Sequence, residues 1–339
     1  RIAAAKSAGV CVRFAKNEEK YLSLPHLDTP FPHVFISPRF ARDEGYDLGE
    51  YTFQSVGSVA VCGAVSPCGE MLDACAAPGG KSVLLAGKCG RVTSFELHPH
   101  RVELIRQYRE RMGVNNVSER QKDSSVFDPD YEETFDGVLC DVPCSGFGTV
   151  SENPDIKLFR KEEDFVFLRA AQKGILDACC RYVKRGGKLY YSTCSVFAEE
   201  NDGIVGEFLK THPEFESLPA ESPLPFARKA YGLQFLPDEA FGAGFYVAVM
   251  RRRAGEKPGG EPEKAVFQRK GMNLFRHQAL TVQQAVRKAA GHIKAKIAAV
   301  HSSSARRTEK GRMRADGEVQ ALFGRRILYP PQHTNRMIL

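Results

Sequence analysis

Residues 73–82 read D-A-C-A-A-P-G-G-K-S, and this stretch decides the fold. It follows the apolar pair Met71–Leu72, typical of a strand end, and precedes the apolar segment Val83–Ala86, typical of a helix. Its glycines allow the backbone to approach a bound molecule, and the free N–H groups of a helix start attract acceptor atoms. The stretch therefore predicts a ligand site between a strand and a helix. A structural turn that binds nothing is the alternative.

Two common phosphate-binding patterns are absent from this stretch. The glycines stand directly before the lysine, so neither G-x-x-x-x-G-K-[ST] nor G-x-G-x-x-G is formed. A P-G-G-K turn after a first strand better suits a nucleoside bound without a phosphate chain, and S-adenosylmethionine is the candidate. The residues expected to contact this cofactor are Cys75, Ala76, Ala77, Pro78, Gly79, Gly80 and Lys81.

From residue 70 onward, apolar segments of strand length alternate with segments of helical periodicity. The expected strands are Met71–Cys75, Arg91–Leu97, Asn116–Gln121, Phe135–Asp141, Lys188–Thr193, Gly232–Leu236 and Phe245–Arg251. The expected helices are Lys81–Lys88, Pro99–Met112, Glu162–Val183 and Ala198–Lys210. This alternation predicts an α/β domain with a parallel sheet covered on both faces. Ligands of such sheets bind beyond the carboxyl ends of the strands.

The ends of the chain differ from this domain, which we expect over 51–252. Residues 1–50 are interrupted by prolines and predict the remnant of a small N-terminal lobe, and the first residue, Arg1, predicts missing N-terminal sequence. Residues 253–339 predict a linker and a basic tail that is partly helical or disordered. Residues 251–339 hold 20 Lys and Arg against 6 Asp and Glu, so the net charge of +7 comes from this end. Such a tail predicts contact with a polyanion, most often nucleic acid, and a solvated tail is the alternative.

Composition narrows the class of protein further. No run of eighteen apolar residues exists, and Ile2–Val12 is too short and mixed for a signal peptide, so a cytoplasmic protein without a membrane partner is predicted. The ten cysteines form no C-x-x-C pair, so neither structural zinc, nor any other metal, nor a disulfide framework is expected. We expect a monomer.

Two acidic residues follow expected strands. Glu96 ends the second strand, where a carboxylate accepts both hydroxyl hydrogens of a ribose. Asp123 follows the third strand and is predicted to accept from an adenine amino group, although Ser124 and Phe127 are alternatives for that edge. A surface acid is the alternative for Glu96.

Two cysteine motifs stand at the ends of later strands. Residues 141–146 read D-V-P-C-S-G, and residues 192–195 read S-T-C-S, followed by E-E-N at 199–201. Together with D-A-C-A-A-P-G-G-K, these motifs resemble the Sun-type (NSUN-type) RNA cytosine-5 methyltransferases. The segment N-P-D-I-K at 153–157 makes the chain most similar to the bacterial ribosomal RNA small subunit methyltransferase B group. The resemblance runs from about residue 49 to residue 250.

The resemblance implies a Rossmann-like methyltransferase fold with a mostly parallel seven-stranded sheet, helices on both faces, a small N-terminal lobe and a basic C-terminal tail. It implies methyl transfer from S-adenosylmethionine to carbon 5 of cytosine in RNA, with ribosomal RNA as the expected partner. By the family pattern, Cys194 is the nucleophile and Cys144 acts in product release. Asp141 is expected to hold the amino edge of the cytosine and to face the cofactor. Lys157 and Arg160 are candidates for phosphate contacts.

Methylation at carbon 5 of cytosine is also favoured by a nucleophilic thiol in the site. Carbon 5 of cytosine is a poor nucleophile, and a thiolate that adds to carbon 6 activates it; a base then removes the carbon 5 proton. Cys144 is the alternative nucleophile, because the Pro-Cys cysteine attacks in DNA cytosine-5 methyltransferases. A further alternative is that both cysteines are buried core residues without a catalytic role. The rival functions are a catalytically idle RNA-binding assembly factor of the same fold and an NAD-linked oxidoreductase.

Overall fold

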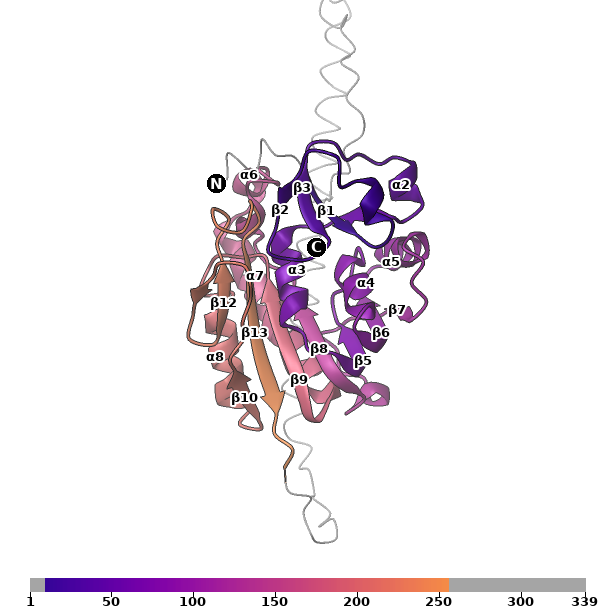
Figure 1. Ribbon diagram of the computed structural model, residues 1–339. Helices are drawn as coiled ribbons and strands as arrows, with labels where there is room; N and C mark the ends of the chain where they lie inside the picture. The colour runs from indigo at the N-terminus through magenta and orange to yellow at the C-terminus, as the bar shows by residue number, and fades with distance from the viewer. Residues whose placement is uncertain (1–9, 256–339) are drawn as a thin grey trace, which may run out of the picture. The chain divides into compact units, whose positions relative to one another are not determined.

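The computed structural model describes residues 10–255, whose elements are arranged as Figure 1 shows. The strands are β1 Val10–Phe14, β2 Leu27–Asp28, β3 Val34–Ser37, β4 Tyr51–Phe53, β5 Cys68–Asp73, β6 Cys89–Glu96, β7 Val117–Gln121, β8 Phe135–Asp141, β9 Val183–Thr193, β10 Phe215–Leu218, β11 Ala227–Arg228, β12 Gly232–Phe235 and β13 Phe245–Arg252. The α-helices are α2 Glu44–Asp47, α3 Val56–Ala64, α4 Gly80–Ala86, α5 Pro99–Arg111, α6 Ile156–Phe159, α7 Glu162–Cys179 and α8 Asp202–Thr211. The predicted tail lies, from residue 256 on, outside the described residues.

A mixed sheet of nine strands forms the centre of the described chain. Strands β9, β8, β5, β6 and β7 run parallel to their neighbours, while β13, β12, β11 and β10 join by antiparallel pairing. The seven predicted strands form the continuous path β12-β13-β9-β8-β5-β6-β7. The predicted count of seven is wrong by the two short edge strands β10 and β11, which pair antiparallel because no crossover helix separates them from their partners.

Helices cover both faces of this sheet, which confirms the predicted fold class. Neighbouring strand residues point to opposite faces. One core cluster contains Met71 and Tyr190 together with buried residues of α3 and α4. The other contains Leu72 and Tyr191 together with buried residues of α7 and α8. Because both faces are buried, the central strands contain adjacent buried apolar residues, such as Met71–Leu72 and Tyr190–Tyr191, in place of an alternating pattern.

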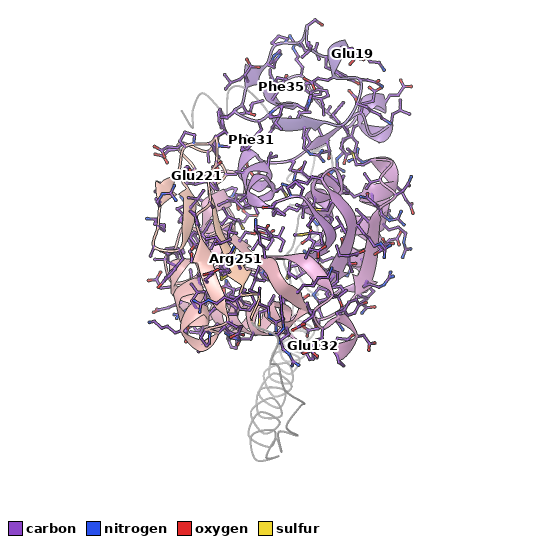
Figure 2. All side chains as sticks on the ribbon, turned by 60° about the horizontal axis from the view of Figure 1, so that its bottom comes forward. Glu19, Phe31, Phe35, Glu132, Glu221 and Arg251 are labelled. Carbon is purple, nitrogen blue, oxygen red and sulfur yellow. The ribbon has the colours of Figure 1, made fainter. Side chains whose placement is uncertain are left out.

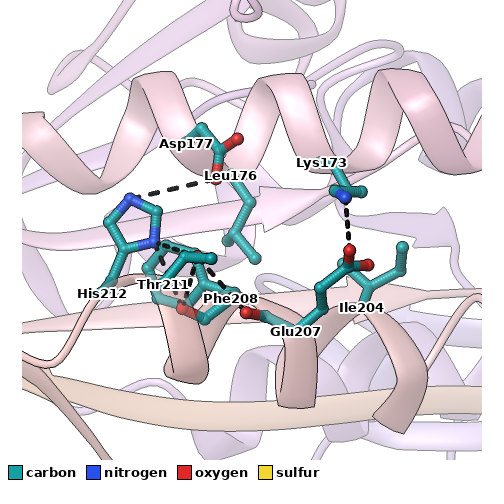
Figure 3. Close-up of a pocket in the computed structure, with 8 residues that line it drawn as sticks. All are labelled: Lys173, Leu176, Asp177, Ile204, Glu207, Phe208, Thr211 and His212. Carbon is teal, nitrogen blue, oxygen red and sulfur yellow. Dashed lines mark hydrogen bonds and ion pairs between the residues drawn. The ribbon is translucent and has the colours of Figure 1, made fainter.

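Helices α7 and α8 pack against each other on one of these faces (Figure 3). Lys173 of α7 forms an ion pair with Glu207 of α8, with 2.6 Å between Nζ and Oε1. At the other end of this contact His212 lies 3.9 Å from Asp177 and stacks on Phe208. A pocket is present between these two helices, and none of the predicted site residues lines it.

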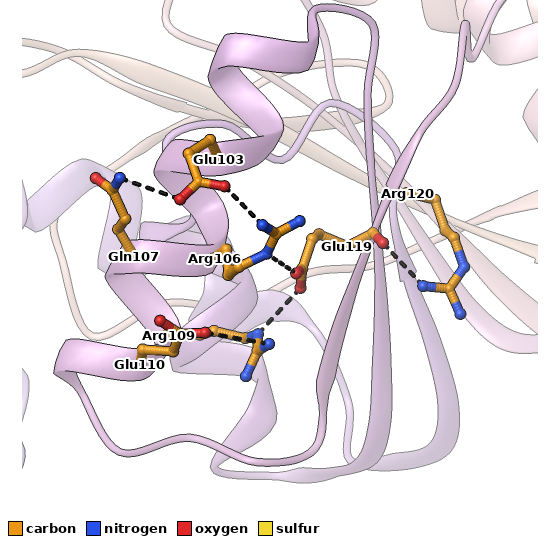
Figure 4. A network of polar contacts seen from close by, with 7 residues as sticks. All are labelled: Glu103, Arg106, Gln107, Arg109, Glu110, Glu119 and Arg120. Carbon is orange, nitrogen blue, oxygen red and sulfur yellow. Dashed lines mark hydrogen bonds and ion pairs between the residues drawn. The ribbon is translucent and has the colours of Figure 1, made fainter.

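Helix α5 is attached to the parallel edge strand β7 by charged side chains (Figure 4). Glu119 of β7 accepts hydrogen bonds from Arg106 Nε at 2.9 Å and from Arg109 Nε at 3.0 Å. Pro99 begins this helix, at a position where the missing N–H has no intrahelical acceptor. These contacts attach α5, which follows Glu96 in the chain, to the edge strand β7, which precedes Asp123.

A second, four-stranded antiparallel sheet has the order β2-β3-β1-β4. Strands β1, β2 and β3 lie within residues 1–50, where the small lobe is expected, and the sheet extends beyond residue 50 because β4 pairs with β1. Its core holds Phe14 and Tyr51, and Phe31 joins the core cluster of α3; Figure 2 shows Phe31 and Phe35 in this part of the molecule. Arg111 of α5 donates hydrogen bonds to the carbonyl oxygens of Tyr46 and Tyr51, which joins this sheet to the larger unit.

Candidate active site

The turn between β5 and α4 has the glycine geometry that its sequence indicates. Gly79 has a φ of +108°, a region in which L side chains are strained, and a Cβ there would lie 3.3 Å from the Cα of Ile105. The turn is closed by a hydrogen bond of 2.7 Å from Gly79 N–H to the Ala76 carbonyl, and Ala76 N–H donates to Phe95. Residues 75–81 therefore form a tight connection at the carboxyl ends of β5 and β6.

Asp73 ends β5 as a fully buried carboxylate. Its Oδ2 accepts a hydrogen bond of 2.7 Å from Ser82, which in turn accepts one from Ser94. Its Oδ1 is buried and has no hydrogen-bond partner. Burial raises the pKa of Asp73 to about 6. An acceptor without a donor at this place is unusual for a buried group.

Glu96 and Asp123 follow neighbouring parallel strands, as predicted, but in different environments. Glu96 is 4% exposed, and its Oε1 accepts from the backbone N–H of His98 at 3.0 Å and lies 3.5 Å from Arg101 Nη1. Asp123 is exposed, and its Oδ1 accepts from the N–H and the hydroxyl of Ser125. The geometry gives Glu96 a fixed carboxylate, whereas Asp123 belongs to a local turn.

An ion pair connects the glycine turn with the end of β8. Lys81 Nζ lies 2.7 Å from Asp141 Oδ2, and the two side chains are 15% and 20% exposed. Ser192 of β9 donates to Asp141 Oδ1 at 2.6 Å. Burial works against the charge of Lys81, but the neighbouring Asp141 carboxylate raises the pKa of Lys81 above its ordinary value. Lys81 therefore stays protonated and holds Asp141 in place.

The two motif cysteines lie against each other beyond the ends of β8 and β9. Cys144 Sγ and Cys194 Sγ are 3.2 Å apart, and both cysteines are free. Cys144 is buried, whereas Cys194 is partly exposed. The hydrogen bond with Cys194, together with burial, raises the pKa of Cys144 well above its ordinary value. Cys144 is thus the thiol that keeps its proton, and Cys194 is the one that a ligand can reach.

A buried carboxylate holds the loop that carries Cys144. Glu200 is fully buried and accepts from the backbone N–H of Ser145 at 2.8 Å, from the Ser145 hydroxyl at 2.5 Å and from Gln172 Nε2 at 3.0 Å. Gln172 also donates to the carbonyl oxygen of Pro143. Three hydrogen bonds to Glu200 and Gln172 therefore fix residues 143–145, and a fourth joins Gln172 to Glu200.

An amide network holds the loop that carries Cys194. Asn201 accepts from the Thr193 hydroxyl at 2.6 Å and donates to the carbonyl oxygen of Ser195 at 3.1 Å. Its amide also donates to Gln234 Oε1 at 2.8 Å, and Gln234 donates to Ser195 as well. The residues on both sides of Cys194 are therefore fixed by side chains distant in the sequence.

The segment after Cys144 packs closely on the same loops. Gly148 N–H donates to the carbonyl oxygen of Cys194 at 2.9 Å, and a Cβ at this glycine would lie 2.7 Å from that oxygen, so only glycine fits. Arg160, a predicted phosphate contact, donates to the carbonyl oxygens of Ser145 at 3.1 Å and Cys144 at 3.3 Å. In this structure Arg160 therefore supports the Cys144 loop.

The structure brings together most of the residues singled out in the sequence. Residues 75–81, Asp141, Cys144 and Cys194 lie along the carboxyl edge of the sheet, as the strand registers and the Lys81–Asp141 pair require. Ser192, Gln172 and Gln234 received no role from the sequence. The E-E-N motif at 199–201 contains Glu200 and Asn201 of the supporting network, but the motif does not indicate their partners.

Among the described residues, no group of three or more His, Cys, Asp or Glu is placed to hold a metal, and no helix there is long and apolar enough to cross a membrane.

The residues at the strand ends fit a nucleoside-type cofactor. Asp73 offers a buried carboxylate oxygen that lacks a donor, and Glu96 offers a fixed carboxylate beyond the neighbouring strand. At Gly80 the nearest atoms to a Cβ would be 3.7 Å away or more, so the backbone is approachable there. These acceptors and the glycine backbone match the hydroxyl and amino hydrogens of such a molecule.

Comparison with known proteins places the chain among RNA methyltransferases. A probable ribosomal RNA small subunit methyltransferase B of Bacillus subtilis is 39% identical over 220 residues, which cover 61% of this chain and 49% of that protein. The corresponding protein of Erwinia tasmaniensis is 34% identical over 214 residues, covering 61% of this chain and 48% of the relative. The chain spans about half the length of the curated relatives it matches.

Solved structures agree on the fold. The crystal structure of PH0851 is similar with a TM-score of 0.67 and 28% identity, covering 71% of this chain and 59% of the other. A methyltransferase homolog protein from Pyrococcus horikoshii has a TM-score of 0.62 and 24% identity, covering 74% and 89%. The family model described as 16S rRNA methyltransferase RsmB/F matches residues 64–251, which hold the glycine turn, both cysteine motifs and the buried network. The chain belongs to this methyltransferase family.

Proposed function

We propose that this protein transfers a methyl group from S-adenosylmethionine to carbon 5 of cytosine in RNA, through a covalent bond to Cys194. The observation that carries the proposal is the thiol pair Cys144–Cys194, with sulfurs 3.2 Å apart beyond β8 and β9, together with the Lys81–Asp141 ion pair at the end of β8. The ribosomal RNA named for the relatives is the proposed substrate class. The family membership of residues 64–251 supports the same chemistry.

Cys194 is the proposed nucleophile because it is the more exposed thiol and has a hydrogen-bond donor beside it. The Cys144 thiol is placed to donate to the Cys194 sulfur, and this contact together with burial raises the pKa of Cys144. The Cys194 thiolate adds to carbon 6 of cytosine, and the electron pair of the 5,6 double bond moves to carbon 5. Covalent catalysis of this kind replaces one difficult step by easier ones.

Cys144 is the proposed group for release of the product. Once Cys194 is bonded to carbon 6, the contact that does most to raise the pKa of Cys144 is lost, while burial still acts on this thiol. Cys144 can then lose its own proton and take the proton from carbon 5 after methylation. The electron pair of that bond re-forms the 5,6 double bond, and the Cys194 thiolate leaves.

The remaining predicted residues hold the two reactants. Asp141, fixed by Lys81 and Ser192, is proposed to accept from the cytosine amino group, a donor that uracil lacks. S-adenosylmethionine supplies an electrophilic methyl group when bound. Residues 75–81, with Glu96 on the ribose and Asp123 on the adenine edge, are proposed to bind it. Since carbon 6 is shielded inside a duplex, the target cytosine must be unpaired or flipped out.

Two rival proposals differ in their predicted outcomes. In the first, Cys144 is the nucleophile; its burial and raised pKa argue against it. In the second, the protein is a catalytically idle RNA-binding assembly factor; the intact set Asp141, Cys144 and Cys194 argues against loss of turnover. A cytoplasmic monomer stays a prediction.

The test uses the full chain, labelled S-adenosylmethionine and total RNA, with digestion to nucleosides. We expect label in 5-methylcytidine for the wild type. Cys194→Ala should lower the rate on the order of 10⁴-fold or more, as removal of a nucleophile does. Cys89→Ala is the control, because this thiol lies at the amino end of β6, and it should keep the wild-type rate. Label in another nucleoside, or full activity of Cys194→Ala, would refute the proposal.

A further inference from the structure

A second pair of thiols lies at the opposite edge of the sheet from Cys144 and Cys194. Cys68 begins β5, Cys89 begins β6, and the two residues are register partners of these parallel strands. Their sulfurs are 3.5 Å apart. Cys68 is partly exposed, whereas Cys89 is 5% exposed. The proposed methyl transfer uses neither thiol.

The backbone around this pair lets the two sulfurs approach each other. Gly69 and Gly90 follow the two cysteines, and a Cβ at Gly90 would lie 2.9 Å from the carbonyl oxygen of Gly69. Register partners on neighbouring strands also have the Cα separation that a disulfide spans.

The surrounding charges favour one thiolate in the pair. The hydrogen bond from the Cys68 thiol lowers the pKa of Cys89 to about 7, although burial opposes this shift. The pKa of Cys68 rises for the same reason, with burial adding to it. Lys88 stands next to Cys89, and its ammonium group donates to the carbonyl oxygens of Cys62 and Val65 at the end of α3. Asp136 is the facing acid, and Lys184 pairs with it at 2.6 Å.

We propose that Cys68 and Cys89 form a redox-sensitive site that a hydroperoxide converts to an intramolecular disulfide. The Cys89 thiolate attacks one oxygen of the hydroperoxide, so that Cys89 becomes a sulfenic acid and the leaving oxygen takes up a proton. The Cys68 thiol then attacks the Cys89 sulfur and loses its proton, and hydroxide leaves as water. In sum, two thiols lose two electrons and two protons, and hydrogen peroxide is reduced to two molecules of water.

The product would link the first residues of β5 and β6. At the other edge of the sheet, β5 ends at Asp73, just before the predicted cofactor residues 75–81, and β6 ends at the predicted cofactor residue Glu96. The disulfide therefore changes the covalent connection of the sheet without touching the glycine turn or the Cys144–Cys194 pair. This inference does not depend on the proposed function.

The experiment treats the reduced full chain with a small molar excess of hydrogen peroxide, blocks free thiols and maps peptides without reduction. We expect a Cys68–Cys89 linked peptide that loses two hydrogens and disappears on treatment with dithiothreitol. Cys62 serves as the internal control: burial raises its pKa to about 12, so it should stay a free thiol. The variant Cys89→Ser should give no link and leave Cys68 blocked by the thiol reagent.

Three results would overturn the proposal. One is an unlinked Cys68 under conditions that already link Cys144 to Cys194. Another is oxidation of Cys62 at the same rate as Cys89, which would mean unselective attack. The third is conversion of Cys89 to sulfinic acid without a link. The wild-type peptide map decides each of these, so the conclusion does not depend on the folding of the variant.

Discussion

The thiol pairs Cys144–Cys194 and Cys68–Cys89 belong to the same sheet, and their surroundings differ more than their sulfur–sulfur distances. Cys144 and Cys194 lie 3.2 Å apart in loops beyond the carboxyl ends of β8 and β9, while Cys68 and Cys89 lie 3.5 Å apart at the amino ends of β5 and β6. The first pair shares its edge of the sheet with the Lys81–Asp141 ion pair, and its loops are held by Glu200 and Asn201. The second pair is held by strand pairing and by Asn116, whose amide donates to the carbonyl oxygen of Cys89 at 3.0 Å.

The difference shows what the fold supplies at each edge. At the amino edge, regular strand geometry places two sulfurs together, which is enough for a bond between them. At the carboxyl edge, the chain leaves the strands, so side chains must form hydrogen bonds with the N–H and C=O groups of the loop backbone. Those side chains also position the reactive groups, and for this reason we expect substitutions there to affect methyl transfer most.

The largest expected difference between the two edges is the loss of methyl-transfer activity when the ion pair at each edge is broken. Asp141→Asn removes the carboxylate that pairs with Lys81, whose side chain is only 15% exposed, and the acceptor proposed for the cytosine amino group. We expect kcat/KM to fall about 10²–10³-fold, the usual loss for one such polar contact in an active site. Initial rates with saturating cofactor measure this.

Asp136→Asn is the matched control at the amino edge. Asp136 pairs with Lys184 at 2.6 Å, but the side chains are 35% and 41% exposed, and exposed pairs contribute about 0–1 kcal/mol. We expect unchanged kcat/KM and a small loss of stability. Equal losses of activity in both variants would contradict the assignment of function to the carboxyl edge.

A smaller effect, on stability, should come from the support of the Cys144 loop. Glu200→Gln replaces a buried acceptor of three hydrogen bonds by an amide that accepts with one oxygen. We expect the free energy of unfolding to fall by about 2–3 kcal/mol, since hydrogen bonds to charged groups are the stronger ones. Urea titration measures it. The neighbouring Glu199 is exposed, so Glu199→Gln should stay within about 0.5 kcal/mol of wild type. Equal losses of the free energy of unfolding in both variants would mean that the Glu200 network does not support the Cys144 loop.

The smallest effect should be a pH dependence with opposite signs at the two edges. Burial raises the pKa of Asp73 to about 6. Its ordinary value is about 4, so the stability contributed by protonated Asp73 is complete below about pH 4 and lost as the pH rises through 6. The free energy of unfolding of Asp73→Asn, relative to that of the wild type, should therefore rise by about 1.4 kcal/mol between pH 5 and pH 8.

Asp136 should behave in the reverse way. Burial works to raise its pKa, but the hydrogen bond from Lys184 lowers it overall. The stability that ionised Asp136 contributes is present above its ordinary pKa and is lost as the pH falls. The difference in free energy of unfolding between Asp136→Asn and the wild type should therefore become smaller in acid. Unfolding titrations at several pH values check both signs. A gain for Asp73→Asn that is independent of pH would contradict a buried acid at this place.

The larger sheet was predictable because its strands are buried on both faces and its helices are periodic. Phe135–Asp141 was predicted with the bounds of β8, and Pro99 marked the start of α5. The small sheet was not predictable, because its strands are short and β1 pairs with two partners that follow it in the chain. The edge strand β11 has two residues, too few for a periodic pattern.

The site was predictable where chemistry stands in contiguous motifs. The glycine turn and both cysteines were found in this way, and the structure places them along one edge. The 3.2 Å contact of Cys144 with Cys194 and the donors on Glu200 depend on segments far apart in the sequence, so no local pattern gives them. The roles of Glu96 and Asp123 stay predictions.

The central claim is that the carboxyl-edge pair divides two tasks, attack by Cys194 and release by Cys144. The most direct measurement incubates Cys144→Ala with S-adenosylmethionine and RNA, followed by a denaturing gel and mass spectrometry of the linked peptide. We predict a stable protein–RNA adduct through the sulfur of Cys194 that carries a 5-methylated cytosine. An adduct that instead accumulates in Cys194→Ala, bonded to Cys144, would contradict the account.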